Sequence, residues 1–123
     1  MAIVRVLVVD DQAGFLRAMT SVVQETPGFE VAGAASSGEE CLVVAAEMLP
    51  DLVLMDVNLP GIDGLEATRR LLGRDYAPVV LLLSTYDADA GEQFVAQSGA
   101  TAYVTKSAFG PDILEEAWST AVR

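Results

Sequence analysis

Apolar runs alternate with amphipathic segments along the whole chain. A short continuous apolar run between turn residues is typical of a strand buried in a parallel sheet, whereas apolar residues at helical spacing indicate a helix packed on one face. The apolar runs predict strands over Ile3 to Val9, Phe29 to Ala34, Asp51 to Met55, Val79 to Ser84, and Ala102 to Thr105. Each of these runs is followed by an amphipathic segment.

The predicted helices run from about Gln12 to Gln24, from Ser37 to about Met48, from Asp63 through Leu72, from about Ala88 to Gln97, and from Pro111 to the end of the chain. Ser37 precedes Glu40 at the spacing of a capping box, and Pro27 and Pro50 lie where the first two helices should end. Gly91 and its alanine neighbours predict a fourth helix that packs weakly and is mobile.

Strict alternation of strand and helix predicts one doubly wound α/β domain with a five-stranded parallel sheet, spanning residues 1–123. The second strand is the least apolar and therefore suits a sheet edge, which favours the strand order 2-1-3-4-5. Strand order then reverses between the first and third strands. Ligands of open α/β sheets bind at such a reversal, beyond the carboxyl ends of the strands.

Polar residues stand at the carboxyl ends of four predicted strands. Asp10 and Asp11 follow the first, Asp56 the third, Ser84 ends the fourth, and Lys106 follows the fifth. Because parallel strands place their carboxyl ends on one edge of the sheet, we expect these side chains to converge.

Composition narrows the possible functions. The net charge of −11 argues against direct nucleic-acid binding by this domain. The absence of histidine excludes a Ser-His-Asp triad, a histidine-liganded zinc site and an internal phosphohistidine. No apolar run has the length of a membrane span, and none has the flanks of a signal peptide, so we expect a cytoplasmic protein. The lone Cys41 suits a small core residue better than a redox role, and Lys106 is the only lysine.

Three carboxylates at one crevice repel each other, so either one is protonated or a cation joins them. Hard oxygen ligands suit Mg²⁺, which often accepts substrate phosphate as well. A metal, a lysine and a hydroxyl around a further carboxylate can support phosphoryl transfer, with the carboxylate as nucleophile and an aspartyl-phosphate as product.

The chain resembles the receiver domain of two-component response regulators over essentially its whole length. The matching segments are Val8 to Asp11, Leu54 to Gly64, Leu83-Ser84, and Tyr103 to Lys106. The resemblance implies a flavodoxin-like (βα)5 fold in which Asp56 accepts a phosphoryl group from a phosphohistidine on a partner sensor histidine kinase.

The remaining roles are also implied by this resemblance. Asp11, the Asp56 carboxylate and the backbone carbonyl of Asn58 would ligate Mg²⁺, with Asp10 acting through a metal-bound water. Lys106 would pair with one phosphoryl oxygen and Ser84 with another, and Tyr103 would turn inward as Ser84 moves.

The same resemblance implies a signalling domain rather than an enzyme with an external substrate, since its only catalysis would be its own phosphorylation and dephosphorylation. Phosphorylation would switch the surface formed by the fourth helix, fifth strand and fifth helix, where self-association would occur. The stretch from Lys106 to Leu114 resembles receivers fused to helix-turn-helix outputs. Control of transcription, with DNA contacted by a segment outside this chain, is therefore the implied output.

Two residues depart from the family pattern. Ser107 replaces the proline that usually follows the lysine, often with a cis bond, so we expect a trans or strained Lys106–Ser107 link. Tyr86 stands two residues after Ser84, where the side chain affects access of attacking water. We expect its bulk to slow loss of the phosphoryl group.

Three other functions fit the sequence less well. A phosphatase of the haloacid dehalogenase type would need a second aspartate where Asn58 stands. A flavodoxin-like electron carrier would need a hydroxyl-rich loop where the chain has Asp10 to Ala13. A degenerate receiver that only binds other proteins is the third alternative, opposed by the complete acidic set and by Lys106.

Overall fold

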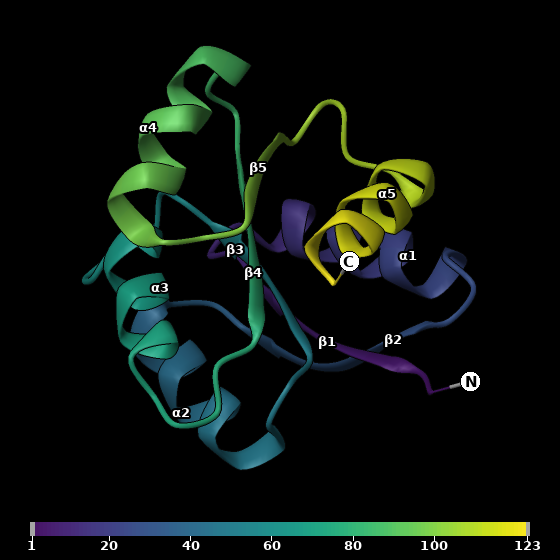
Figure 1. Cartoon of the computed structure of the whole chain (residues 1–123), viewed down its shortest axis with the longest axis horizontal. Coiled ribbons are helices and arrows are strands. Elements are labelled where there is room, and N and C mark those ends of the chain that lie inside the picture. Colours follow the sequence, from purple (N-terminus) through teal and green to yellow (C-terminus); the bar gives the residue numbers. More distant parts are fainter. Residues whose placement is uncertain (1, 123) are drawn as a thin grey trace.

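A computed structural model describes residues 2–122, and its centre is a five-stranded parallel sheet in the order β2-β1-β3-β4-β5 (Figure 1). The strands are β1 (Val4–Val9), β2 (Phe29–Ala35), β3 (Leu52–Asp56), β4 (Val79–Ser84) and β5 (Ala102–Thr105). Parallel pairing is continuous from β2 to β5. Both the predicted fold class and the predicted strand order are confirmed.

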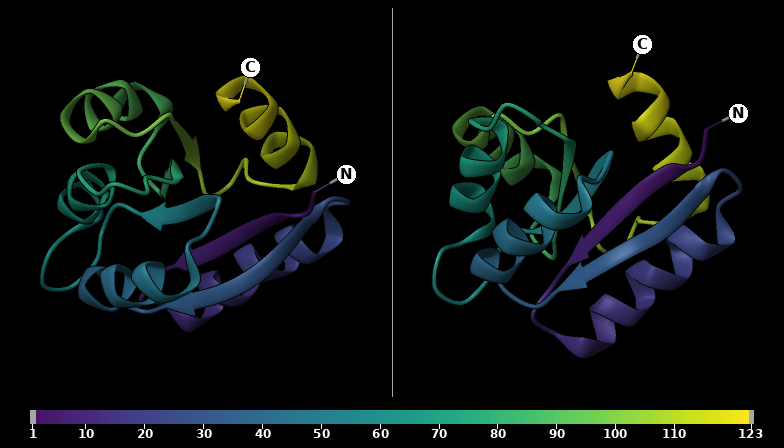
Figure 2. Two further views of the ribbon diagram at one scale, coloured as in Figure 1. Left: turned by 60° about the horizontal axis from the view of Figure 1, so that its bottom comes forward. Right: turned by 90° about the horizontal axis from the view of Figure 1, so that it is seen from below.

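Helices cover both faces of the sheet (Figures 1 and 2). They are α1 (Ala13–Glu25), α2 (Gly38–Met48), α3 (Gly64–Leu72), α4 (Ala88–Ser98) and α5 (Pro111–Ala121). Helices α1 and α5 lie on one face, and α2, α3 and α4 lie on the other. This division follows from the strand order, since each crossover must return to the sheet in the same hand.

Alternate residues of the central strands feed two separate cores. Leu7, Val53 and Leu82 point into the core beneath α2, α3 and α4, while Leu54 and Leu81 point into the core beneath α1 and α5. Strand β3 is buried on both faces along its full length, which explains its unbroken apolar sequence. Two closely packed faces hold β3 rigidly and so hold the aspartate that ends it.

The helix starts agree with the cap signals in the sequence. The Ser37 hydroxyl accepts the Glu40 N–H at 3.0 Å, and the Asp63 carboxylate accepts the Glu66 N–H at 2.8 Å. Glu40 itself accepts the N–H of Ser36, one residue earlier than a standard capping box requires. The expected caps at α2 and α3 are therefore present.

Several boundaries differ from prediction by one residue, because element ends depend on individual hydrogen bonds. The most useful shift is in β3, which includes Asp56 as its last residue. Cys41 is fully buried, and burial raises its pKa to about 12, in agreement with a core role. Within residues 2–122 no helix has both the length and the apolarity needed to span a membrane. Residues 1 and 123, the ends of the predicted domain, lie outside the described part.

Candidate functional site

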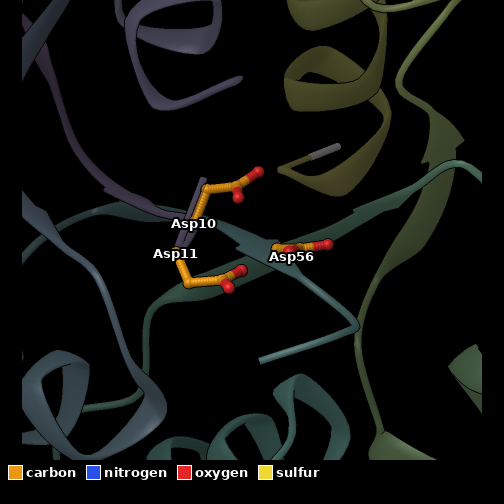
Figure 3. A group of neighbouring side chains, drawn as sticks. All are labelled: Asp10, Asp11 and Asp56. Carbon is orange, nitrogen blue, oxygen red and sulfur yellow. The ribbon is translucent and has the colours of Figure 1, made fainter. Parts of the chain in front are cut away.

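An acidic cluster lies at the carboxyl edge of the sheet, where β1 and β3 end side by side (Figure 3). Asp10, Asp11 and Asp56 each bring a carboxylate oxygen to within 4.8 Å of the others. Asp10 and Asp56 are buried, whereas Asp11 is exposed to solvent. The convergence predicted from the strand ends is thus present, with one solvent-facing side through which a ligand could enter.

The backbone around Asp56 is closed off by α3. The Gly64 N–H donates to the Val57 carbonyl at 2.9 Å, which ties the start of α3 to the residue after Asp56. A Cβ atom on Gly64 would overlap the Asp56 carbonyl oxygen and lie 2.9 Å from its carbonyl carbon. Glycine is therefore required by close backbone approach, a function beyond the turn role that its position in the sequence indicates.

Lys106 extends from the end of β5 across the cluster. Its Nζ lies 2.8 Å from Asp10 Oδ2 and 3.4 Å from Asp56 Oδ1, and its side chain is 8% exposed. The ammonium is therefore shared by the two buried carboxylates, with the shorter contact to Asp10. Asp10 also accepts the Gln12 N–H through Oδ1 at 2.9 Å, which fixes its orientation at the start of α1.

The charges at this edge are not balanced. Burial, and then the neighbouring Asp10 carboxylate, raise the pKa of Asp56 to about 6, although Lys106 and the Asn58 N–H act in the opposite direction. One ammonium is thus insufficient for three carboxylates. Within residues 2–122, the buried Asp10 Oδ2 also accepts no hydrogen bond of favourable angle. Excess negative charge and hard oxygen donors together fit a divalent cation such as Mg²⁺.

Ser84 ends β4 beside the acidic cluster. It is buried, and its hydroxyl accepts the side-chain N–H of Asn58 at a long 3.5 Å. The Asn58 backbone N–H points to Asp56 Oδ1 at 3.4 Å. Both distances are long for hydrogen bonds, so these contacts hold the Ser84 hydroxyl and Asn58 only weakly.

Tyr103 lies against α4 and the loop after β4. Its hydroxyl donates to the backbone carbonyls of Ser84 and Tyr86. Its ring packs edge-to-face on Phe94 with centroids 5.8 Å apart, and Phe94 packs on Tyr86 in the same way at 5.6 Å. This chain of three rings joins β5, α4 and the β4–α4 loop.

Gly91 of α4 faces the Tyr103 ring. A Cβ atom there would lie 2.6 Å from Cγ of Tyr103, well inside contact distance. The sequence suggested that Gly91 weakens α4; in the structure it provides the space that the tyrosine occupies.

The Lys106–Ser107 link is trans, since no peptide bond within the described residues is cis. This agrees with the expectation drawn from the missing proline. The loop closes through Ala108 N–H, which donates to the Thr105 carbonyl at 3.1 Å.

The residues to which the sequence analysis gave a role in the site all lie at or beside this edge, although their individual roles stay predictions. They are Asp10, Asp11, Asp56, Asn58, Ser84, Tyr103 and Lys106. Sequence reasoning missed two neighbours of the site, Gly64 and Gly91, in addition to Phe15, whose ring centroid lies 3.9 Å from Lys106 Nζ. Phe15 has the same helical spacing as the apolar residues Met19 and Val23 of α1, which by itself indicates a position on the buried face. Only its 36% exposure, unusual for a core position, distinguishes it.

Comparison with known proteins agrees with this geometry. The family model described as "Response regulator receiver domain" matches residues 6–118. Response regulator GacA of Pseudomonas aeruginosa is 42% identical over 85% of this chain and 49% of its own length. Transcriptional regulatory protein LiaR of Bacillus subtilis is 31% identical over 91% of this chain and 53% of its own length.

Among solved structures, the signal receiver domain of the putative response regulator NarL from Mycobacterium tuberculosis superimposes with a TM-score of 0.88 at 27% identity, covering 99% of this chain and 98% of that one. The chain spans about half the length of GacA and of LiaR. The acidic edge, the lysine and the fold therefore agree with the sequence match, and the chain belongs to the response regulator receiver domain family.

Proposed function

We propose that Asp56 accepts a phosphoryl group from a phosphohistidine of a partner sensor histidine kinase. The observation that carries this proposal is the shared edge of Asp10, Asp11, Asp56 and Lys106, where a rigid strand presents a carboxylate beside a cation. Family membership supports phosphoacceptor signalling in general. Residues 1–123 contain no histidine, so a phosphohistidine donor must lie outside this domain.

The residues that would hold Mg²⁺ are Asp11 and Asp56 through their carboxylates and Asn58 through its backbone carbonyl, with Asp10 acting through a bound water. When bound, Mg²⁺ would neutralise charge on the phosphoryl oxygens and on the acidic cluster. The three converging carboxylates, two of them buried and sharing a single ammonium, support this assignment.

Three residues of the chain would take part directly in the transfer. An Asp56 carboxylate oxygen forms the new bond to phosphorus while the bond to the donor breaks and its electron pair leaves with the donor. Lys106 would pair with one phosphoryl oxygen, and the Ser84 hydroxyl would donate to another. Both residues lie close to Asp56. Lys106 Nζ is 3.4 Å from Asp56 Oδ1, and Ser84 directly follows Leu83, the register partner of Asp56 in the β3–β4 pair.

Phosphorylation adds charge and acceptor oxygens to the site. If Ser84 moves toward them, the carbonyls that hold the Tyr103 hydroxyl move as well, because one of them belongs to Ser84. Tyr103 would then transmit the change to the surface of α4, β5 and α5, through which we propose that the protein self-associates.

We propose that the output is transcription, supported by the likeness to LiaR and by the resemblance of Lys106 to Leu114 to receivers fused to DNA-binding domains. The charge of −11 supports a domain that does not itself bind nucleic acid. We further propose that residues 1–123 form one receiver domain whose only catalysis is its own phosphorylation and dephosphorylation. It would act in the cytoplasm, away from membranes.

Intact mass spectrometry after incubation with acetyl phosphate and Mg²⁺ tests the proposal. Wild type should gain one phosphoryl group, and Asp56→Asn or omission of Mg²⁺ should abolish the gain. Because a receiver could reject a small donor, a phosphorylated histidine kinase serves as the second donor. Failure with both donors would refute phosphoacceptance and favour a degenerate receiver that only binds proteins.

A further inference from the structure

Lys106 lies between two kinds of surface. On one side are the Asp10 and Asp56 carboxylates, 2.8 and 3.4 Å from Nζ, and on the other is the Phe15 ring, with its centroid 3.9 Å away. Phe15 is in the first turn of α1, four residues after Asp11. The same short segment therefore supplies both an anionic contact and an aromatic cover for one ammonium.

The placement of Phe15 is not explained by core packing alone. Its side chain is 36% exposed, whereas Met19 and Val23 on the same helix are buried. Yet Lys106, which its ring covers, is only 8% exposed. The exposed Phe15 ring thus lies between Lys106 and solvent.

Two physical effects favour this arrangement. An ammonium over the face of an aromatic ring is attracted by the ring quadrupole, more strongly where water is excluded. A lysine stem is long and flexible, and a wall on its open side removes rotamers that point away from the carboxylates. A small cavity of about 50 Å³ beside the stem, with Phe15, Leu83 and Phe109 among its lining residues, shows that the surroundings are apolar.

We propose that Phe15 is a positioning residue for phosphoryl transfer: its ring holds the Lys106 ammonium at the Asp10–Asp56 edge and excludes water from it. The inference rests on the proposed function and assigns that site one more component. Phe15 does not touch the phosphoryl group. It acts through Lys106, which must be in place when the Asp56 oxygen bonds to phosphorus and the acetate of acetyl phosphate leaves with the electron pair.

The test compares variants that keep or remove the ring. Phe15→Leu and Phe15→Met keep an apolar side chain without a ring face, and Phe15→Tyr keeps the ring. Phe29→Leu is the matched control, because Phe29 begins β2 at the opposite edge of the sheet. The first readout is the maximal rate of phosphorylation by acetyl phosphate, measured together with the Mg²⁺ concentration that gives half of it.

The second readout is specific to the contact. Lys106 is the only lysine, so labelling with ¹³C-lysine reports on this side chain alone. Its ε-methylene protons should be shifted upfield by the ring in wild type and Phe15→Tyr, and should move toward ordinary values in Phe15→Leu and Phe15→Met. A merely structural role of Phe15 would not link this shift to the reaction rate.

We expect both ring-free variants to be slowed about twofold to thirtyfold, the range that corresponds to loss of one cation–π contact. Phe15→Tyr and Phe29→Leu should stay near the wild-type rate, and the Mg²⁺ requirement should not change. Ring-free variants as fast as wild type, Phe15→Tyr as slow as Phe15→Leu, or lysine signals that are identical in all variants would each overturn the inference. If wild type accepts no phosphoryl group from either donor, the proposed function is refuted and the positioning role with it. If wild type is phosphorylated and the variants behave alike, the inference alone is refuted.

Discussion

Replacement of Asp56 by asparagine should make the metal-free protein more stable at neutral pH. Asp56 is 3% exposed, and burial together with the Asp10 charge raises its pKa from 3.8 to about 6. The ionised carboxylate is therefore disfavoured in the folded state, even with Lys106 nearby. Asparagine has nearly the same shape and no charge, so it removes the unfavourable ionisation while leaving the core intact.

The direction and the magnitude of this stability change follow from proton binding to Asp56. Because the folded state keeps a proton on Asp56 to a higher pH than the unfolded chain, unfolding releases this proton between about pH 4 and about pH 6, and stability falls as pH rises through that window. A pKa increase of this size lowers the free energy of unfolding by about 3 kcal/mol at a pH where Asp56 is ionised in both the folded and the unfolded state. The free energy of unfolding of Asp56→Asn should therefore be higher than that of wild type by about 3 kcal/mol near neutral pH and by only about 1 kcal/mol near pH 4.5.

Urea unfolding in the presence of EDTA at about pH 7.5 and about pH 4.5 measures this difference. Asp75→Asn is the control, because Asp75 is an exposed carboxylate in the loop before β4, away from the acidic edge. It should change stability little at either pH. An Asp56→Asn protein no more stable than wild type near neutral pH, or a gain that does not vary with pH, would refute the reasoning.

Three further predictions concern the cation, the loop and the switch. Mg²⁺ at one hundred times its Kd should stabilise wild type by about 2.7 kcal/mol in thermal unfolding, and Asp11→Asn should require much more Mg²⁺; an equal response of both proteins would exclude Asp11 as a ligand. Tyr86→Ala should lose its phosphoryl group faster than wild type in a mass-spectrometric time course, because the ring of Tyr86 would no longer hinder water; an unchanged lifetime contradicts this. Gly91→Ala should cost about 1–3 kcal/mol in urea unfolding, because its Cβ overlaps the Tyr103 ring. Gly14→Ala, where a Cβ meets no atom within 4 Å, is the control, and equal stability of the two variants would show that Tyr103 moves aside freely.

Much of the architecture was predictable because it depends on local pattern. Apolar runs interrupted by helical periodicity indicated the strands, the helices and their alternation, and the handedness of βα units leaves few ways to assemble them. Strand ends are also local features, so Asp10, Asp11, Asp56, Ser84 and Lys106 were identifiable without coordinates. Because parallel strands end on one edge of the sheet, these side chains could be expected to converge.

Contacts between residues of different helices and strands were decided by the tertiary structure. The sharing of Lys106 between Asp10 and Asp56, with the shorter contact to Asp10, has no counterpart in sequence spacing. Gly91 has a role that its local signal does not contain: helix propensity says only that glycine weakens a helix, whereas in the structure the missing side chain allows Tyr103 to pack on α4. The helical spacing of Phe15 indicates only a position on the apolar face of α1. Its position over the lysine became visible only when α1 and β5 were seen together, because contacts between residues so far apart in the chain are fixed by packing and not by local preference.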